Sequence, residues 1–341
     1  NGVVAPDSLT GQFAALANDQ TSNADYRMIP FEKLQVKKVD IIEDTIGRYR
    51  KTFPELVSAV KAYRASHPDF DLVVDILHGS AGPYVRLFEE MNAKIVRTAP
   101  MREGTYPQET FLEDGEEKLY RPEPKELFLD KQAFETFSAT AADGSMYIGI
   151  DGDGDRAAVW VKQGGRAVEF APNKLGPLYA WYLLSSGRTT DAACIAKTLP
   201  TTYAMDVLAK KYGLPLHVTP VGSKHFAPYM RDSSVEKAAV VIEESGHAGL
   251  RIGKETWFDD ATTQALLMLE IVAHYQADLV SVMGMAQKAI GYSSVDKRVN
   301  KDLTEELKEK IKSPLLDDPA GLALRIEKAV GARAEEISVT T

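Results

Sequence analysis

The chain has 341 residues, of which 44% are hydrophobic and 26% charged, and its formal net charge is −9 at pH 7. This composition is typical of a globular protein, and the length predicts two or three domains. The acidic balance excludes a protein that wraps nucleic acid, which needs a basic stripe. No apolar run approaches the ~20 residues that a membrane span needs. The single cysteine, Cys194, excludes a disulfide framework, argues against cysteine-based zinc sites and indicates a cytoplasmic protein.

The first 40 residues are mixed and polar, and only residues 8–18 predict a helix there. The opening Asn1-Gly2 resembles neither a signal peptide nor an initiator-methionine start. We therefore expect the chain to begin within a longer domain.

An alternation of helices and strands then begins. Pro54 stands where a proline opens a helix. The predicted elements are helix 55–66, strand 71–77, helix 83–91, strand 93–96, helix 130–138, strand 146–150 and strand 157–161. Residues 101–125 are rich in Glu, Pro and Gly and predict a long surface excursion. The strand–helix–strand order predicts parallel strands.

Gly164-Gly165 indicates a hairpin, after which the alternation resumes. The predicted elements are helix 173–185, strand 193–197, helix 201–212, strand 215–219, helix 226–232, strand 238–242 and helix 260–276. The element order of the two sets is comparable, which predicts a structural repeat. Helices at 303–311 and 321–330 and a strand at 335–341 are expected near the end.

Three carboxylates follow the predicted strand 146–150, in the segment Asp151-Gly152-Asp153-Gly154-Asp155-Arg156. The glycines allow a tight loop in which the side chains converge, and converging carboxylates repel one another unless a cation lies among them. Oxygen ligands suit Mg²⁺, and Arg156 suits a phosphate oxygen. An EF-hand is excluded, because its glycine and bidentate glutamate positions hold Arg156 and Lys162. A plain polar turn is the alternative interpretation.

A second polar segment, Glu243-Glu244-Ser245-Gly246-His247, follows the predicted strand 238–242. A glutamate can accept hydrogen bonds from two adjacent sugar hydroxyls, and Ser245 adds a donor and an acceptor. His247 can donate a hydrogen bond or move a proton near neutral pH. Taken alone, this segment fits a solvated turn equally well.

Two further segments place positive charge at strand ends. Val221-Gly222-Ser223-Lys224-His225 precedes a helix and would present backbone N–H groups and a lysine to an anion. Lys197 ends the strand 193–197. Ordinary solvation of both lysines is the alternative. His78-Gly79-Ser80-Ala81-Gly82 lacks the spacing of a dinucleotide-binding loop, and its glycines are interpreted as close helix–strand packing.

Together these residues resemble the α-D-phosphohexomutase superfamily, the phosphoglucomutase and phosphomannomutase enzymes. The acidic segment 151–156 resembles the family's Mg²⁺ loop, and segment 243–247 resembles its sugar-recognition loop. Residues 75–79 resemble the opening strand and turn of its second domain, and residues 221–224 resemble its third-domain loop near the sugar phosphate. Lys197 matches a basic strand-end position that contacts substrate.

The resemblance implies an α/β fold of consecutive mixed or parallel-sheet domains whose outer members are incomplete. Residues 1–40 would be the tail of a nucleophile domain with a linker, and 41–166 the metal-loop domain. Residues 167–292 would form the sugar-recognition domain, and 293–341 an incomplete phosphate-binding domain.

The implied reaction interconverts hexose 1-phosphate and hexose 6-phosphate, of glucose or mannose, through a phosphoserine and a hexose 1,6-bisphosphate. Asp151, Asp153 and Asp155 would hold Mg²⁺, while Glu243 and Ser245 would bind sugar hydroxyls. Arg156, Gly222, Ser223 and Lys224 would contact phosphate, and Lys197 and His247 are candidates for proton transfer or phosphate contact.

The family's phosphoserine loop, of the Thr-Ala-Ser-His-Asn-Pro type, and its C-terminal Arg-Ser-Gly-Thr-like loop are not found in these 341 residues. We therefore expect this form to lack mutase activity. Two alternatives stay open: a phosphatase of the haloacid-dehalogenase type, which also places Asp-x-Asp after a buried strand, and a non-catalytic core that binds sugar phosphates.

Overall fold

The computed structural model describes residues 10–15, 17, 40–77, 79–96, 110–113, 116–119, 131–230, 236–253 and 256–292. Residues 10–15 are helical, within the predicted helix 8–18. The elements predicted beyond residue 295 lie outside the described residues. Residues 40–292 belong to one compact unit, Asn1–Ser294.

The first sheet has the strand order β2-β1-β5-β6-β7. Its strands are β1 (Leu72–Asp75), β2 (Lys94–Val96), β5 (Met146–Ile150), β6 (Ala157–Gln163) and β7 (Arg166–Phe170). β2, β1 and β5 are parallel, whereas β6 and β7 are antiparallel additions. Gly164 and Gly165 both have positive φ in the β6–β7 turn, as a tight two-residue hairpin requires, so the predicted hairpin is confirmed.

The second sheet has the order β12-β11-β10-β8-β9. Its strands are β8 (Cys194–Thr198), β9 (Leu216–Thr219), β10 (Ala238–Ile242), β11 (Ala248–Ile252) and β12 (Thr256–Phe258). Here too three strands are parallel and the last two are antiparallel. When the five strands of each sheet are numbered by their order in the chain, they lie side by side as second, first, third, fourth and fifth. This shared order confirms the predicted repeat at the level of topology.

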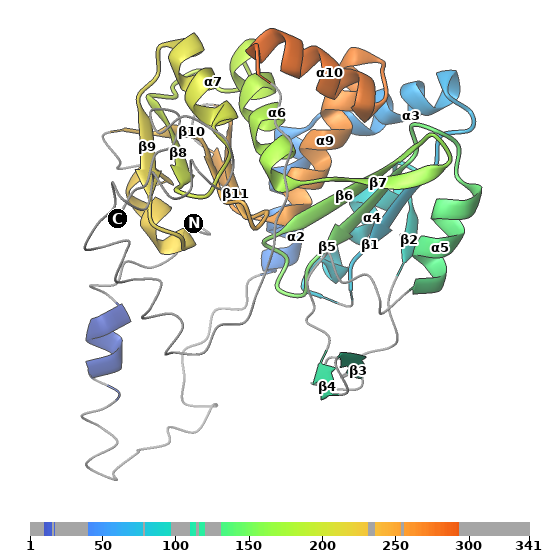
Figure 1. Cartoon of the computed structure of the whole chain (residues 1–341), viewed down its shortest axis with the longest axis horizontal. Helices are drawn as coiled ribbons and strands as arrows, with labels where there is room; N and C mark the ends of the chain where they lie inside the picture. The colour runs from blue at the N-terminus through green and yellow to red at the C-terminus, as the bar shows by residue number, and fades with distance from the viewer. Residues whose placement is uncertain are drawn as a thin grey trace, which may run out of the picture. The chain divides into compact units, whose positions relative to one another are not determined.

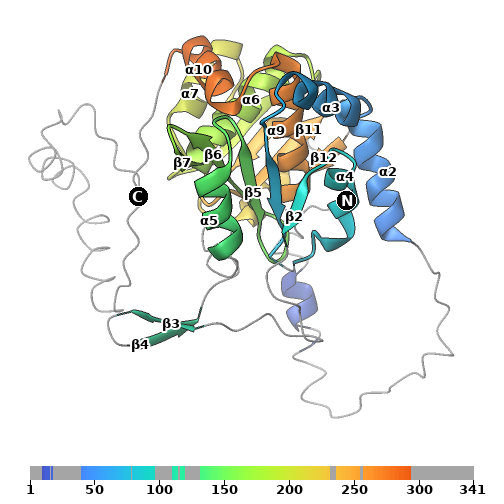
Figure 2. The same ribbon diagram turned by 90° about the vertical axis from the view of Figure 1, so that its right-hand side faces the viewer.

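Helices cover both sheets (Figures 1 and 2). They are α2 (Ile41–Thr52), α3 (Leu56–Ser66), η2 (Gly82–Tyr84), α4 (Val85–Glu89), α5 (Lys131–Thr140), α6 (Pro172–Ser185), α7 (Ala204–Tyr212), η4 (Ser223–Phe226), α8 (Ala227–Met230), α9 (Ala261–Tyr275) and α10 (Leu279–Ile290). A short antiparallel pair, β3 (Thr110–Glu113) and β4 (Glu116–Leu119), lies within the segment that was predicted as a surface excursion.

Helix α9 connects the two sheets, because it packs on β5 and β6 of the first sheet and on β11 of the second (Figure 1). Nearly every residue of α9 is buried, including the polar Thr262, Thr263 and Gln264 of its first turn. Asp260 caps its N-terminus by accepting the Thr263 N–H at 2.7 Å. One continuous apolar core consequently includes strands of both sheets.

No single helix in the described part of the chain is long and apolar enough to cross a membrane. Helices α9 and α10 reach that length and composition only together, and they are bent by 84° at the break between them.

The first sheet ends at Phe170, because β7 pairs with β6, while the division into domains near residue 166 stays a prediction. One predicted helix start needs correction. Pro54 is not the first residue of a helix, because α3 begins at Leu56 with Glu55 at its N-cap.

Candidate active site

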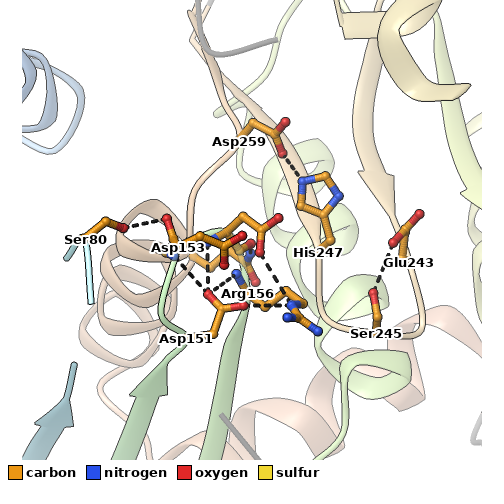
Figure 3. A network of polar contacts seen from close by, with 11 residues as sticks. Ser80, Asp151, Asp153, Arg156, Glu243, Ser245, His247 and Asp259 are labelled. Carbon is orange, nitrogen blue, oxygen red and sulfur yellow. Dashed lines mark hydrogen bonds and ion pairs between the residues drawn. The ribbon is translucent and has the colours of Figure 1, made fainter. Parts of the chain in front are cut away.

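The acidic loop connects β5 to β6 and is organised by its first carboxylate. Asp151 is fully buried, and its Oδ1 accepts backbone N–H groups of Gly154, Asp155 and Arg156 at 3.0–3.1 Å. Its Oδ2 accepts the Arg156 Nε–H at 2.7 Å (Figure 3). The short side chain of aspartate therefore folds the loop onto itself. Burial raises the pKa of Asp151 to about 6, although the Arg156 N–H and the guanidinium act against this rise.

Neighbouring segments hold this loop from two sides. Ser80 donates its N–H to Gly152 O at 2.9 Å and its hydroxyl to Asp153 O. A Cβ on Gly79 would lie 2.5 Å from Gly152 O, so only glycine fits there. The predicted role of this glycine in helix–strand packing is thus wrong, because it packs against the backbone of the acidic loop. On the other side, α9 contributes the Ala261 N–H, which donates to Gly154 O at 2.8 Å.

The structure brings the three aspartates of the loop close together. One carboxylate oxygen from each of Asp151, Asp153 and Asp155 lies within 4.8 Å of the others. The Asp155 Oδ1 is buried and has no hydrogen-bond partner among the described residues, although Arg156 Nε lies 3.5 Å away. An orphaned carboxylate oxygen beside two further carboxylates fits a cation with oxygen ligands such as Mg²⁺.

The second polar loop connects β10 to β11 and is organised by Glu243. Its Oε1 accepts the Gly222 N–H at 2.9 Å, and its Oε2 accepts the Ser245 hydroxyl at 3.1 Å. Glu243 therefore holds the predicted anion loop 221–225 beside the predicted sugar loop. Its neighbour Glu244 accepts the Thr198 hydroxyl at 3.1 Å. Each carboxylate oxygen of Glu243 keeps a further lone pair for a ligand hydroxyl.

The two loops are in direct contact. Arg156 and His247 form an isolated antiparallel bridge through their backbones, which joins the acidic loop to the sugar loop. Gly246 has a φ of +101°, and a Cβ there would lie 3.3 Å from the Pro172 ring and 3.4 Å from Ala157 O. The close approach of the loops thus depends on a glycine.

His247 forms a buried pair with an aspartate that sequence reasoning did not select. Its Nε2 lies 2.6 Å from Asp259 Oδ1, and both side chains are more than nine-tenths buried (Figure 3). Burial opposes the imidazolium, but the hydrogen bond and charge of Asp259, with the charges of Asp155 and Glu243, outweigh it and raise the pKa of His247. Asp259 therefore orients the ring and favours its protonated form.

The structure gives Lys197 a different environment from the expected one. Its ammonium is buried, pairs with Asp206 of α7 and donates to the carbonyls of Thr201 and Thr202 at 3.2 and 3.3 Å. These three acceptors match its three donors, so in this structure the ammonium holds the segment after β8, and contact with substrate stays a prediction. Lys224 is exposed at the start of η4, while Gly222 and Ser223 are half-buried beside it.

A cavity of about 260 Å³ opens beside the acidic loop. Ser80, Asp153, Gly154 and Asp259 line it together with Trp257, so it borders the acidic loop and Asp259, whereas no residue of the sugar loop 243–247 lines it. Its other lining residues are Thr45, Arg48, Tyr49, Ala81, Tyr84, Phe258, Asp260 and Thr262. Arg48 of α2 adds a positive charge to the cavity wall. Sequence reasoning missed it, because a single arginine on a helix belongs to no recognisable motif.

A model of the family described as "Phosphoglucomutase/phosphomannomutase, alpha/beta/alpha domain III" matches residues 171–289. The phosphoglucomutase of Rhizobium radiobacter is 28% identical over 334 residues, which cover 91% of this chain and 56% of that protein. Phosphoglucomutase-1 of Macaca fascicularis is 30% identical over 223 residues, which cover 64% of this chain and 36% of that protein. The chain thus spans about half, or less, of the length of these curated relatives.

Among solved structures, the open form of parafusin, a phosphoglucomutase from Paramecium, superposes with a TM-score of 0.55. The identity is 22%, and the superposition covers 76% of this chain and 44% of the other. This likeness confirms the predicted α/β fold. The family match to domain III favours a phosphohexomutase over a haloacid-dehalogenase-type phosphatase.

Proposed function

Because this chain belongs to the α-D-phosphohexomutase superfamily, we propose that it binds Mg²⁺ and a hexose phosphate in one site. The site is built from the acidic loop 151–156 and the sugar loop 243–247. The observation that carries this proposal is the backbone bridge between Arg156 and His247, which joins a carboxylate cluster to a hydroxyl-binding loop. The reaction served is the interconversion of hexose 1-phosphate and hexose 6-phosphate, of glucose or mannose.

The sugar is recognised by the β10–β11 loop. Glu243 accepts hydrogen bonds from two adjacent hydroxyls with its remaining lone pairs, and Ser245 is half-buried beside it. These groups are fixed before the ligand arrives, because Glu243 is already held by the Gly222 N–H. Preorganisation of this kind reduces the entropy that binding must overcome.

Phosphate is recognised by positive charge on both sides of the sugar. Arg156, on the acidic loop, and Lys224, with the backbone of Gly222 and Ser223, are the groups for its oxygens. His247, whose pKa Asp259 raises, donates a hydrogen bond to a phosphate oxygen or a proton to the leaving hydroxyl oxygen.

Asp151, Asp153 and Asp155 would hold the Mg²⁺. When bound, this ion neutralises charge on a phosphoryl group and so lowers the barrier to its transfer. Arg156 keeps Asp151 ionised within the loop, and Ser80 keeps the loop backbone in place.

The complete reaction needs a phosphoserine as covalent relay. The Oγ–P bond of that serine breaks as a sugar hydroxyl forms the new O–P bond and loses its proton, which gives hexose 1,6-bisphosphate; the reverse step at the other phosphate restores the phosphoserine. No segment of these 341 residues matches the family's serine loop. We therefore expect the 341-residue chain alone to bind hexose phosphates without mutase turnover.

The test is calorimetric binding of glucose 1-phosphate and glucose 6-phosphate to the 341-residue chain in Mg²⁺, on a sample whose intact mass is confirmed. The proposal expects both to bind at one site per chain, and Glu243→Ala to weaken both. Glu169→Gln, an exposed site on β7, is the matched control and should change neither. Release of inorganic phosphate would favour the phosphatase, and absence of binding would contradict the proposal.

A further inference from the structure

A second cluster of ligand-type side chains lies on the second sheet, away from both polar loops. It consists of Cys194, His217 and Glu236, and one ligand atom from each lies within 4.8 Å of the others. Cys194 is the first residue of β8, His217 is the second residue of β9, and Glu236 lies two residues before β10. The three come from neighbouring parallel strands at their amino ends.

The strand register places these side chains on one face. On β8, Ala196 lies two residues after Cys194, so their side chains point to the same face of the sheet. His217 of β9 pairs with Ala196 and therefore shares that face. This is the face that α8 covers, because Cys194 packs with Phe226 and Met230. The proposed active site lies at the opposite, carboxyl ends of the same strands, where Thr198 and Glu243 are found.

Contacts with neighbouring residues hold the three side chains of this cluster in place. The His217 ring stacks on Tyr229 of α8, with centroids 4.5 Å apart and planes at 23°. Its Nε2 lies 2.6 Å from Glu236 Oε2. Cys194 is fully buried at the base of the cluster.

We propose that Cys194, His217 and Glu236 bind a thiophilic divalent cation, with Zn²⁺ as the test ion. Thiolate, imidazole and carboxylate are the ligand types of zinc, whereas Mg²⁺ prefers oxygen alone, so the donor set separates this site from the acidic loop. Three protein ligands leave a fourth position for water. Glu236 is half-exposed, and its flexible side chain can move to the roughly 3.3 Å that separates N and O ligands around a tetrahedral ion.

The consequence of binding would be structural. The ion would tie the edge strand β9 and the segment before β10 to β8, so the folded state would gain stability with increasing Zn²⁺. Burial raises the pKa of the Cys194 thiol to about 12, and the charge of Glu236 adds to the rise. A bound cation replaces the thiol proton outright.

The direct test is titration of the reduced 341-residue chain with Co²⁺, followed by the near-ultraviolet charge-transfer band of a thiolate–Co²⁺ bond. Because the chain has one cysteine, that band reports only on Cys194. With Mg²⁺ in excess to fill the acidic loop, we expect a band that saturates at one Co²⁺ per chain, disappears on addition of Zn²⁺ and is absent in Cys194→Ser. His217→Gln and Glu236→Gln should each weaken Co²⁺ binding by more than about tenfold.

Two matched variants serve as controls. His274→Gln removes an exposed histidine from the end of α9, and Asp153→Asn removes an oxygen ligand from the acidic loop; both should keep the band and the affinity. His217 and Glu236 are partly exposed, so their variants decide the question even if Cys194→Ser does not fold. Absence of the band in the unchanged chain, or an unchanged Co²⁺ affinity in both His217→Gln and Glu236→Gln, would overturn the proposal.

Discussion

The β5–β6 loop and the β10–β11 loop occupy the same topological position in two sheets of identical strand order. Each begins with a buried carboxylate, Asp151 or Glu243, and each has a positive-φ glycine three residues later, Gly154 or Gly246. Each is also closed by a backbone hydrogen bond across its base, Asp151 N–H to Arg156 O and Glu243 N–H to His247 O. The two loops therefore share one type of hairpin connection.

The difference lies in the length of the first carboxylate. Aspartate reaches only the N–H groups of its own loop and closes it into a compact cluster of negative charge. Glutamate, one methylene longer, reaches across to the Gly222 N–H and joins a second loop. The same backbone thus yields a cation site in one sheet and a hydroxyl-binding site in the other.

Removing the aspartate should have the largest effect. In Asp151→Ala the acidic loop loses a proposed metal ligand and the acceptor of four hydrogen bonds. We expect Mg²⁺ affinity to fall by more than the roughly 10–100-fold that loss of an outer-sphere partner costs. Calorimetric titration with Mn²⁺ in place of Mg²⁺ measures this. Glu243→Ala should leave cation binding unchanged, and equal losses in both variants would contradict the division of roles.

Removing the glutamate should affect sugar binding instead. Glu243→Ala deletes charge-assisted hydrogen bonds, so binding of glucose 1-phosphate and glucose 6-phosphate should weaken by about 1–3 kcal/mol. The two losses should be similar, because one carboxylate serves both orientations of the sugar. Isothermal titration of each ligand checks this, and a loss confined to one ligand would show that Glu243 reads only one orientation.

The support of the acidic loop can be tested at Gly79. In Gly79→Ala the new methyl group would overlap Gly152 O, so we expect about 1–3 kcal/mol of lost stability and weaker Mn²⁺ binding. Gly47→Ala is the control, because nothing lies within 4 Å of its Cβ position on α2. That change should stabilise the protein by about 0.5–1 kcal/mol in urea denaturation. Equal responses of the two variants would remove Gly79 from the account.

The smallest expected effect is a pH dependence that belongs to the sugar loop. The pKa of His247 is raised above its ordinary value of 6.5 by Asp259, against the opposing effect of burial. The stabilising effect of the pair is therefore complete below about pH 6.5 and is lost as pH rises through the folded-state pKa. Asp259→Asn should lower the pKa of His247.

This prediction is measured by NMR titration of the His247 ring and by urea denaturation at pH 6 and pH 9 in metal-free buffer. The unchanged chain should lose more stability between these pH values than Asp259→Asn does, because only the unchanged chain has the His247–Asp259 pair to lose. The other groups that titrate in this range are the same in both proteins. A His247 titration that does not move in the variant would mean that Asp259 does not control the ring.

The sequence predicted the strands that precede both loops, because Met146–Ile150 and Ala238–Ile242 are apolar runs that end at clustered polar residues. It did not predict β11 and β12, although two glycines at positive φ, Gly246 and Gly253, flank β11. Helices α2 and α10 were also missed, although Asp40 and Asp278 each cap one of them by accepting an N–H three residues later.

For the site, spacing alone could suggest Asp151, Asp153 and Asp155 as a group, because they lie within one loop. It could not assign Asp259 as the partner of His247, because His247 precedes β11 whereas Asp259 follows β12. Nor could it place Ser80 against the acidic loop, which lies more than 70 residues further along the chain. For Lys197, the sequence did not reveal an intramolecular partner. Its place at a strand end suggested ligand contact, but its partner Asp206 lies nine residues along on α7 and pairs with its charge.

The central claim is that the two hairpin loops form one site, and paramagnetic relaxation tests it most directly. Mn²⁺ would replace Mg²⁺ on the acidic loop, and the ³¹P relaxation of bound glucose 1,6-bisphosphate would be measured. Our account predicts strong ³¹P relaxation of the ligand bound to the unchanged chain. In Asp153→Asn, the relaxation should be no greater than that of the free ligand in the same concentration of Mn²⁺. Saturating occupancy of both ligands without enhanced relaxation would place the cation and the sugar phosphate in separate sites and contradict the account.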